Sequence, residues 1–338
     1  MAYESFKLIK KLYFERTSAS KEELKAARIL KKEAEKLGSC ACLEEFEVDA
    51  YNINNAKLKF HNPSIEVECV GVGFSSFTDS KGITGDFIYI TSYQDVLVSD
   101  VKDKICLYAD NIISTPIYKE LARKGAKGII LCSGILYDKK EDTDNSPYMY
   151  RERNYKHGKI PAVSIKIQDA EKILRIMPKS ATIILEEDEF KAKSHNVVAT
   201  IEGTKYKDEI ICFSAHYDSV KFSKGAYDNA TGSTTIMQIL EYFINHRPDR
   251  TLKFIWCGSE ECGLLGSINY TNVHKEELDN YKLNINVDMT GVTIGYDYAC
   301  VSAGDDFYHY LEYFAKINGF RIVNRDGIKR ISSSLYSS

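Results

Sequence analysis

The sequence predicts an α/β protein with a mixed, mainly parallel sheet that is flanked by helices. From residue 193 onward, short apolar runs typical of buried strands alternate with helical patterns. That alternation indicates βαβ units, whose strands are parallel. Between residues 58 and 190 the pattern changes to short strand-like segments separated by glycine and aspartate. This change predicts a second, β-rich module inserted into the first.

The N-terminal region is predicted to be helical over residues 3–38 and extended over residues 43–51. Apolar side chains recur there at helical spacing, and Ser20 followed by Glu23 is the capping-box pattern that marks a helix start. Gly38 suits the position just past a helix end, where the backbone often turns left-handed. The region therefore supplies a helical layer and one strand.

The inserted module contains two strand-and-helix patterns and one long polar stretch. A helix that ends at Gly125 precedes a buried strand, and residues 159–177 read as a strand followed by a helix. Residues 135–159 are polar and rich in tyrosine, so we predict an exposed loop there. The alternative is that this loop reaches a substrate through Tyr148, Tyr150, Arg151 and Arg153.

The last part of the chain begins with a predicted strand at residues 193–203 and continues with three helices and two strands. The helices are expected at 230–246, 264–274 and 305–319, and the strands at 251–258 and 282–289.

Composition indicates a globular protein and excludes several classes. The chain has 338 residues, of which 44% are hydrophobic and 28% charged, and this is enough for two domains. A balance of 45 basic against 48 acidic residues lacks the basic footprint of a nucleic-acid binder. No signal-peptide pattern and no run of about 18 apolar residues occurs, so we expect no membrane span. Nine cysteines, several inside apolar runs, suit reduced thiols and predict a cytoplasmic location.

Ligand-type side chains follow the apolar runs between residues 210 and 289. In an open α/β sheet, residues just past the strand ends line the binding crevice, so these side chains should converge. A lone histidine or an isolated glutamate pair is usually structural or solvated, but the ordered set favours a site. Its members are His216, Asp218, Asp228, Glu260, Glu261 and Asp288.

The residue types fit a hydrolytic metal centre. One imidazole with several carboxylates suits Zn²⁺, Co²⁺ or Mn²⁺, whereas a structural zinc would be expected to use thiolates. Of two adjacent glutamates, one can bind metal while the other stays free to take a proton from the attacking water.

Four motifs in this region resemble the co-catalytic zinc aminopeptidases of peptidase family M28. They are HYDS at 216–219, GAYDNATG at 225–232, SEECGLLGS at 259–267 and NVDMTG at 286–291. The resemblance implies a site with two zinc ions. His216 and Asp288 would be ligands of one zinc, Asp228 the bridging carboxylate, and Glu261 a ligand of the other zinc.

The same resemblance implies two further roles. Glu260 would be the general base, and Asp218 would hold the His216 imidazole from behind, which fixes its tautomer. The family pattern also has a later histidine beside Glu261, past a strand and a turn that would follow the helix at 305–319. This chain reaches GIKRISSSLYSS at 327–338 instead, and His309, in a helix interior, is a poor substitute. We therefore expect an incomplete second zinc site, in a chain that is either truncated, which we favour, or naturally stops here.

Segments KGAKGII at 124–130 and IPAVSI at 160–165 resemble a protease-associated (PA) domain. The implied organisation is a first part of the peptidase domain at 1–57, an inserted PA-like domain at 58–190, and the second part of the peptidase domain at 191–338. Such an insert would act as a lid or a substrate-selecting wall.

The expected function is that of a metal-dependent exopeptidase, an aminopeptidase that removes N-terminal residues from peptides, although this chain would be inactive if the last ligand is absent. Two alternatives stay open. One is a related carboxypeptidase or glutaminyl-cyclase-like acyl transferase, which would use similar metal groups. The other is a catalytically dead binding or scaffold protein. Peptides are the expected partners, and the sequence does not predict an oligomeric state.

Overall fold

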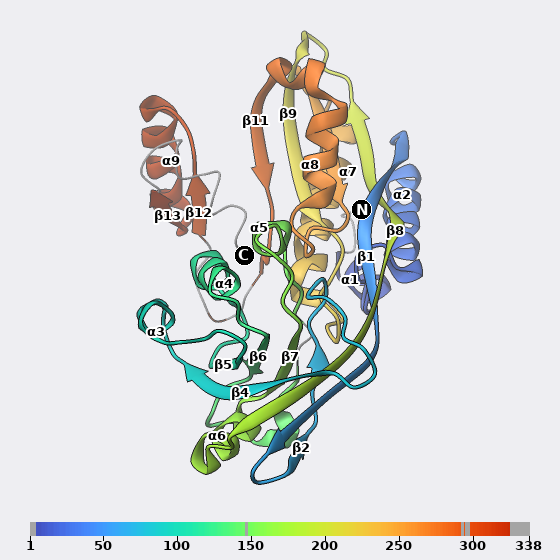
Figure 1. Ribbon diagram of the computed structural model, residues 1–338. Coiled ribbons are helices and arrows are strands. Elements are labelled where there is room, and N and C mark those ends of the chain that lie inside the picture. The colour runs from blue at the N-terminus through green and yellow to red at the C-terminus, as the bar shows by residue number, and fades with distance from the viewer. Residues whose placement is uncertain (1–4, 146–147, 292–293, 295–297, 325–338) are drawn as a thin grey trace. The chain divides into compact units, whose positions relative to one another are not determined.

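The computed structural model describes residues 5–145, 148–291, 294 and 298–324. Its two compact units are unit 1, residues 1–48 with 193–338, and unit 2, residues 49–192 (Figure 1). Two long strands, β1 (Ala41–His61) and β8 (Ser180–Ile201), run through both units. The segment 327–338, on which the expectation of a truncated chain rests, lies outside the described residues.

Unit 1 is built on a mixed sheet in the order β11–β9–β10–β8, with β1 beside β8. β9 (Tyr206–His216) is parallel to β10 (Arg250–Cys257) and to β11 (Tyr281–Asn286). β10 is antiparallel to β8. The predicted α/β class with a mixed sheet is therefore confirmed.

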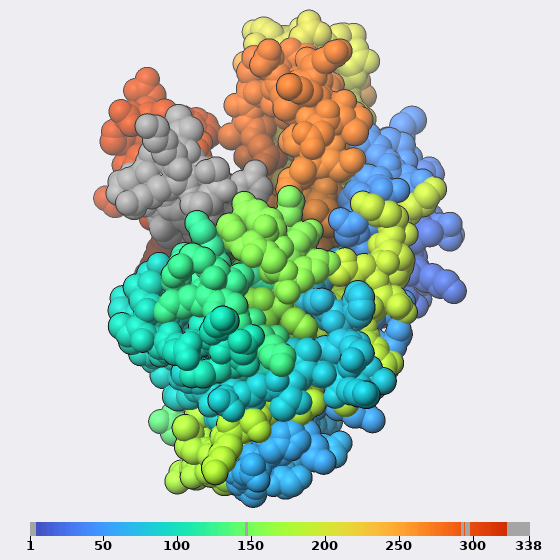
Figure 2. Space-filling model, in the orientation of Figure 1, coloured from blue at the N-terminus to red at the C-terminus, as the bar shows by residue number. Residues whose placement is uncertain are grey.

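Helices cover both faces of this sheet. On one face, α1 (Ser5–Lys11), α2 (Lys21–Lys36) and α7 (Thr231–Asn245) pack against Phe213 and Trp256. On the other face, α8 (Leu265–Val273) packs through Tyr270 against a smaller cluster. Successive side chains of a strand point to opposite faces, so apolar runs in β9 and β10 serve both layers. The surface of α8 is visible in orange in Figure 2.

The remaining elements of unit 1 are short or stand apart from this sheet. A π-type turn, η2 (Ala226–Ala230), leads into α7, and a 3₁₀ turn, η3 (Lys275–Asn280), leads into β11. β12 (Tyr298–Val301) and β13 (Arg321–Asn324) form a parallel pair connected by α9 (Asp305–Asn318). The helices predicted at 230–246, 264–274 and 305–319 are thus confirmed.

The start of α2 follows the predicted capping box. The Ser20 hydroxyl accepts a hydrogen bond from the Glu23 backbone N–H at 2.9 Å. The Glu23 carboxylate accepts one from the Ala19 backbone N–H at 2.8 Å. The Glu23 N–H is a backbone donor that the first turn of a helix leaves unpaired, whereas the carboxylate reaches the residue before the N-cap rather than the N–H of Ser20 itself. Gly38, just past the helix, has the positive φ of 93° that a C-terminal glycine permits.

Unit 2 has a parallel core of its own. β4 (Ile83–Ile90), β5 (Ile105–Tyr108), β6 (Gly128–Ser133) and β7 (Ala162–Lys166) are parallel neighbours. Two short strands flank them: β3 (Val70–Gly71) pairs antiparallel with β7, and β2 (Ile65–Val67) pairs antiparallel with β1. The helical segments of unit 2 are α3 (Tyr93–Val98), α4 (Thr115–Arg123), η1 (Lys140–Asp142), α5 (Glu152–Tyr155) and α6 (Ile167–Ile176). The inserted module is therefore α/β rather than simply β-rich.

The expectation of an exposed loop over residues 135–159 is wrong for part of that stretch. Tyr150 is fully buried, and its ring packs edge-on against Tyr118 with centroids 4.6 Å apart. Its backbone N–H donates to the Gly73 carbonyl at 2.9 Å. Tyrosines bury a large apolar area, so a polar stretch that is rich in them can still contribute to a core.

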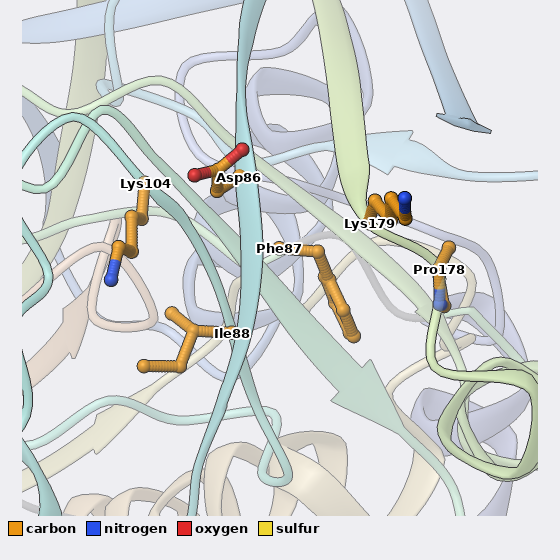
Figure 3. Close-up of a pocket in the computed structure, with 6 residues that line it drawn as sticks. All are labelled: Asp86, Phe87, Ile88, Lys104, Pro178 and Lys179. Atoms are coloured by element: carbon orange, nitrogen blue, oxygen red, sulfur yellow. The ribbon is translucent and has the colours of Figure 1, made fainter. Parts of the chain in front are cut away.

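Unit 2 also has a cavity of about 410 Å³ beside β4 (Figure 3). None of the six predicted site residues lines it. The lining residues are Asp86, Phe87, Ile88, Lys104, Pro178 and Lys179.

Two further observations concern the predicted environment of the protein. All nine cysteines are free thiols in the structure. Among the helices of the described residues, none has both the length and the apolar character needed to cross a membrane.

Candidate metal centre

The parallel strands of unit 1 bring the predicted site residues to one edge of the sheet. His216 is the last residue of β9 and lies opposite Cys257, the last residue of β10. Glu260 and Glu261 follow β10 after a short turn, and Asp288 follows β11. Carboxyl ends of parallel strands share an edge, so three loops meet there. Asp228, in the turn η2 that leads to α7, comes from a fourth loop.

His216 lies at the centre of two groups of ligand-type atoms. Its Nε2 is 2.9 Å from Asp228 Oδ1 and 3.5 Å from Asp288 Oδ1. One ligand atom from each of His216, Asp228 and Asp288 lies within 4.8 Å of the others, and the same holds for His216, Glu260 and Glu261. The structure thus brings together every residue predicted to bind metal. Both glutamates lie near His216, and this proximity does not distinguish a ligand from a free base.

Asp218 is fully buried and mainly organises the two glutamates. Its Oδ1 accepts the Glu260 backbone N–H at 3.0 Å, and its Oδ2 accepts the Glu261 backbone N–H at 3.1 Å. Its contact with the imidazole is longer, with 3.5 Å between Oδ1 and His216 Nδ1. Bonds from backbone N–H groups to a carboxylate are strong and directional. The predicted contact to His216 is therefore accompanied by a second contact that the sequence did not indicate.

Asn229 connects the loop of Asp228 to the loop of Asp288. This fully buried amide accepts hydrogen bonds from the backbone N–H groups of Gly232 at 2.9 Å and Met289 at 3.1 Å. Its Nδ2 donates to the Val287 carbonyl at 3.0 Å. This role of Asn229 was not predicted from the sequence, although the residue lies inside the GAYDNATG motif. A buried amide that satisfies backbone groups on both sides of Asp288 fixes where that carboxylate lies.

Glu260 and Glu261 have raised pKa values because they are buried and lie near other carboxylates. Burial is the largest cause and raises the pKa of Glu260 to about 7 and that of Glu261 to about 8, with the charge on Asp218 adding to both. Burial alone would lower the pKa of His216, but its partners Asp218, Asp228 and Asp288 outweigh this and hold the pKa well above the usual value. Such a cluster of negative charge is stabilised by bound cations.

The residues fit a zinc ion. Glu261 Oε1 and Asp288 Oδ1 are buried and have no hydrogen-bond partner among the residues that the structure describes. Unpaired buried oxygens are costly unless another group satisfies them. An imidazole and carboxylate oxygens are ordinary ligands of catalytic zinc.

Residues 196–322 match the model of peptidase family M28. This part of the chain is therefore similar to the peptidases of family M28. The M28 match spans β9, β10 and β11 and all six predicted site residues.

Similar proteins carry the names of peptidases of two kinds. Aminopeptidase YwaD of Bacillus subtilis (strain 168) is 31% identical over 226 residues, which are 65% of this chain and 47% of the relative. Carboxypeptidase Q of Homo sapiens is 26% identical over 304 residues, 85% of this chain and 64% of the relative. The chain thus spans about half to two thirds of the length of these relatives.

Solved M28 structures have the same fold. The peptidase M28 precursor from Shewanella amazonensis SB2B matches with a TM-score of 0.77 at 21% identity, covering 97% of this chain and 81% of its own. The zinc aminopeptidase BSAP from Bacillus subtilis matches with a TM-score of 0.74 at 23% identity, covering 94% and 78%. The fold predicted from the sequence, that of a zinc-peptidase-like α/β protein, is confirmed.

The connection through Asn229 gives a testable prediction. Asn229→Ala leaves the buried N–H of Gly232 and the part-buried N–H of Met289 without their acceptor, which should cost about 1–3 kcal/mol of unfolding free energy. Trp256, the single tryptophan, is fully buried in unit 1, so its fluorescence during denaturant unfolding reports this unit.

The matched control is Asn245→Ala, since Asn245 is an exposed amide near the end of α7. It should leave the Trp256 transition unchanged. Equal midpoints for the two variants would show that Asn229 does not hold the Asp288 loop.

Proposed function

We propose that the protein is a zinc-dependent exopeptidase that removes N-terminal residues from peptides. The observation that carries this proposal is the convergence on His216 of two groups of carboxylates at the carboxyl edge of the sheet. The match to the M28 family model supports peptide hydrolysis, and the similarity to a protein named as an aminopeptidase supports the direction. The alternative is that the protein removes C-terminal residues as a carboxypeptidase does, and the similarity to carboxypeptidase Q supports this direction.

His216, Asp228 and Asp288 would hold one zinc ion, and Asp228 would share its carboxylate with a second ion beside Glu261. Bound zinc supplies Lewis acidity, which polarises a peptide carbonyl and lowers the pKa of water. Among the described residues, the candidate metal groups all contain His216, and His309 is paired instead with Glu312 at 3.0 Å. We therefore propose that the second zinc site is incomplete in this chain.

Glu260 would act as the general base. Its carboxylate takes a proton from the attacking water, whose oxygen bonds to the peptide carbonyl carbon, and returns it to the amine nitrogen as the C–N bond breaks. Asp218 would keep Glu260 and Glu261 in place through its two backbone hydrogen bonds. Position matters here because a base must lie within hydrogen-bond reach of the proton that it takes.

Unit 2 would act as a PA-type wall that selects substrates. KGAKGII lies across the end of α4 and the start of β6, and IPAVSI lies on β7. Amide exchange in residues 49–192 should slow when a peptide analogue binds.

The protein would work in the cytoplasm, since nine free cysteines suit a reducing compartment. Cell fractionation tests the location.

End-group chemistry tests the direction of cleavage. The protein should release the first residue of a tripeptide that has a free N-terminus and an amidated C-terminus. A tripeptide of the same sequence with an acetylated N-terminus and a free C-terminus should resist, because an aminopeptidase must bind the free amine. Cleavage of the acetylated peptide from its free C-terminus would favour the carboxypeptidase instead.

Glu260→Gln should leave zinc content unchanged and lower turnover by at least about 100-fold, since removal of a general base costs that much. Glu276→Gln, at an exposed glutamate of η3, is the control and should keep full turnover. If Glu260→Gln loses zinc but keeps activity, the roles of the two glutamates are exchanged.

Asp228→Ala should abolish zinc binding, because both proposed sites use this carboxylate. The 338-residue chain itself should bind at most one zinc tightly, through His216, Asp228 and Asp288. Metal analysis after dialysis measures the zinc content of Asp228→Ala and of the unmodified chain. Asp279→Ala, at an exposed aspartate, is the control. Two tightly held ions in the unmodified chain would contradict the incomplete second site, and none would favour a dead binding or scaffold protein.

A further inference from the structure

A buried arginine outside the ligand set contacts two of the site loops. Arg16, between α1 and α2, is fully buried. Its guanidinium donates to the carbonyls of Gly225 at 2.7 Å and Lys224 at 2.8 Å, and its Nε donates to the carbonyl of Tyr217. It also donates to carbonyls of its own segment, at Leu12 and Phe14. A planar group with fixed donor directions can hold several carbonyls at once.

The backbone of Arg16 reinforces the contact with the loop after β9. The Arg16 N–H donates to the Ser219 hydroxyl at 3.1 Å, and the Ser219 N–H donates to the Arg16 carbonyl at 3.2 Å. Tyr217 and Ser219 flank Asp218. The segment therefore fixes the loop that carries the carboxylate beneath Glu260 and Glu261.

Gly225 permits this contact because it has no side chain. A Cβ at that position would lie 2.5 Å from Arg16 Nη1, and the φ of +55° is one that side chains other than glycine rarely adopt. The backbone thus approaches the guanidinium more closely than any other residue would allow. Asp228 follows three residues later, so the same contact fixes the approach to the proposed bridging carboxylate.

The third loop is held by Ser18 and Glu23. The Ser18 hydroxyl donates to the Ser259 hydroxyl at 2.6 Å. Glu23 Oε1 accepts the Ser259 backbone N–H at 2.7 Å and its hydroxyl at 3.1 Å. Glu23 is almost fully buried, and Ser259 directly precedes Glu260. The carboxylate that accepts the Ala19 N–H before α2 therefore also anchors the turn of Glu260 and Glu261.

We propose that residues 16–23 form a clamp in which Arg16 and Glu23 are positioning residues for the metal centre. This inference rests on the proposed function, because it assigns to the clamp the placing of Asp228, Glu260 and Glu261. The clamp acts through the backbone of residues 217–219, 224–225 and 259, and neither residue touches the metal or the substrate.

The charge of Arg16 and its role in positioning the loops lead to opposite predictions for zinc binding when Arg16 is removed. Burial lowers the pKa of Arg16 to about 10, so it stays positive at neutral pH beside Asp218, Asp228 and Glu261. A positive charge near a cation site weakens cation binding. If Arg16 acted only through its charge, its removal would tighten zinc binding. If it positions the loops, removal should weaken zinc binding, as loss of groups that support metal ligands typically does, by about 10- to 100-fold.

The experiment compares Arg16→Met with Arg28→Met, at an exposed arginine of α2. Zinc affinity is measured by competition with a chromophoric chelator. We expect zinc binding about 10- to 100-fold weaker in Arg16→Met and unchanged in Arg28→Met. Guanidinium at non-denaturing concentration, but not ammonium, should partly restore zinc binding to Arg16→Ala, since only the former has the planar set of donors. Unchanged or tighter zinc binding in Arg16→Met would overturn the clamp.

Amide hydrogen exchange gives a readout that needs neither zinc nor activity. Exchange at residues 225–229 and 259–261 should speed up in Arg16→Met, while strand amides at 254–256 keep their native rates. Faster exchange everywhere, or no change in the loops, would contradict a positioning role. If the loops change as expected but the unmodified protein binds no zinc, the proposed function fails and the clamp stands.

Glu23→Gln decides the question if Arg16→Met does not fold. The amide keeps the size of the carboxylate but presents a donor to one of the N–H groups of Ala19 and Ser259. Faster exchange at 259–261 with native exchange at 225–229 is the expected pattern. Native exchange at both places in this variant would overturn the clamp.

Discussion

Much of the structure of unit 1 depends on the parallel pairing of β9 with both of its neighbours. The pairing aligns His216 with Cys257 and Ser214 with Asn286, so the chain leaves three adjacent strands at one edge. Each exit carries a carboxylate or the imidazole within a few residues. Parallel neighbours require crossover connections, and α7 and α8 supply them while covering the two faces of the sheet. The same constraint therefore yields the core and the site.

The site concentrates negative charge, and the protein tolerates this by tying the loops to neutral and positive groups. Asp218 accepts two backbone N–H groups, Asn229 joins the loops of Asp228 and Asp288, and Arg16 lies beneath two loops. Repulsion among these carboxylates costs stability in the metal-free protein. A cation that binds only the folded state recovers some of that stability, about 2.7 kcal/mol at a concentration 100 times Kd.

The sequence predicted the fold class and the convergence of the ligand-type residues, because both follow from local patterns. Apolar runs mark strands, and the motif residues lie within a few positions of the strand ends. It missed Arg16 and Asn229 as connectors and the contact of Glu23 with Ser259. These contacts join positions up to 236 residues apart, and an arginine between two helices carries no local pattern that distinguishes it from a surface arginine. The burial of Tyr150 was missed for a related reason, since polarity averaged over a stretch conceals a single buried aromatic ring.

The close fit of Gly225 to Arg16 has a consequence for how the sequence can vary. A larger residue at position 225 collides with the guanidinium, and a smaller residue at position 16 leaves carbonyls and a cavity that nothing fills. Neither position can change alone without a loss. We expect the two to be inherited together among related proteins, so that chains that keep the arginine also keep the glycine. Their joint variation would record in sequence data a contact between an N-terminal segment and a loop more than 200 residues away.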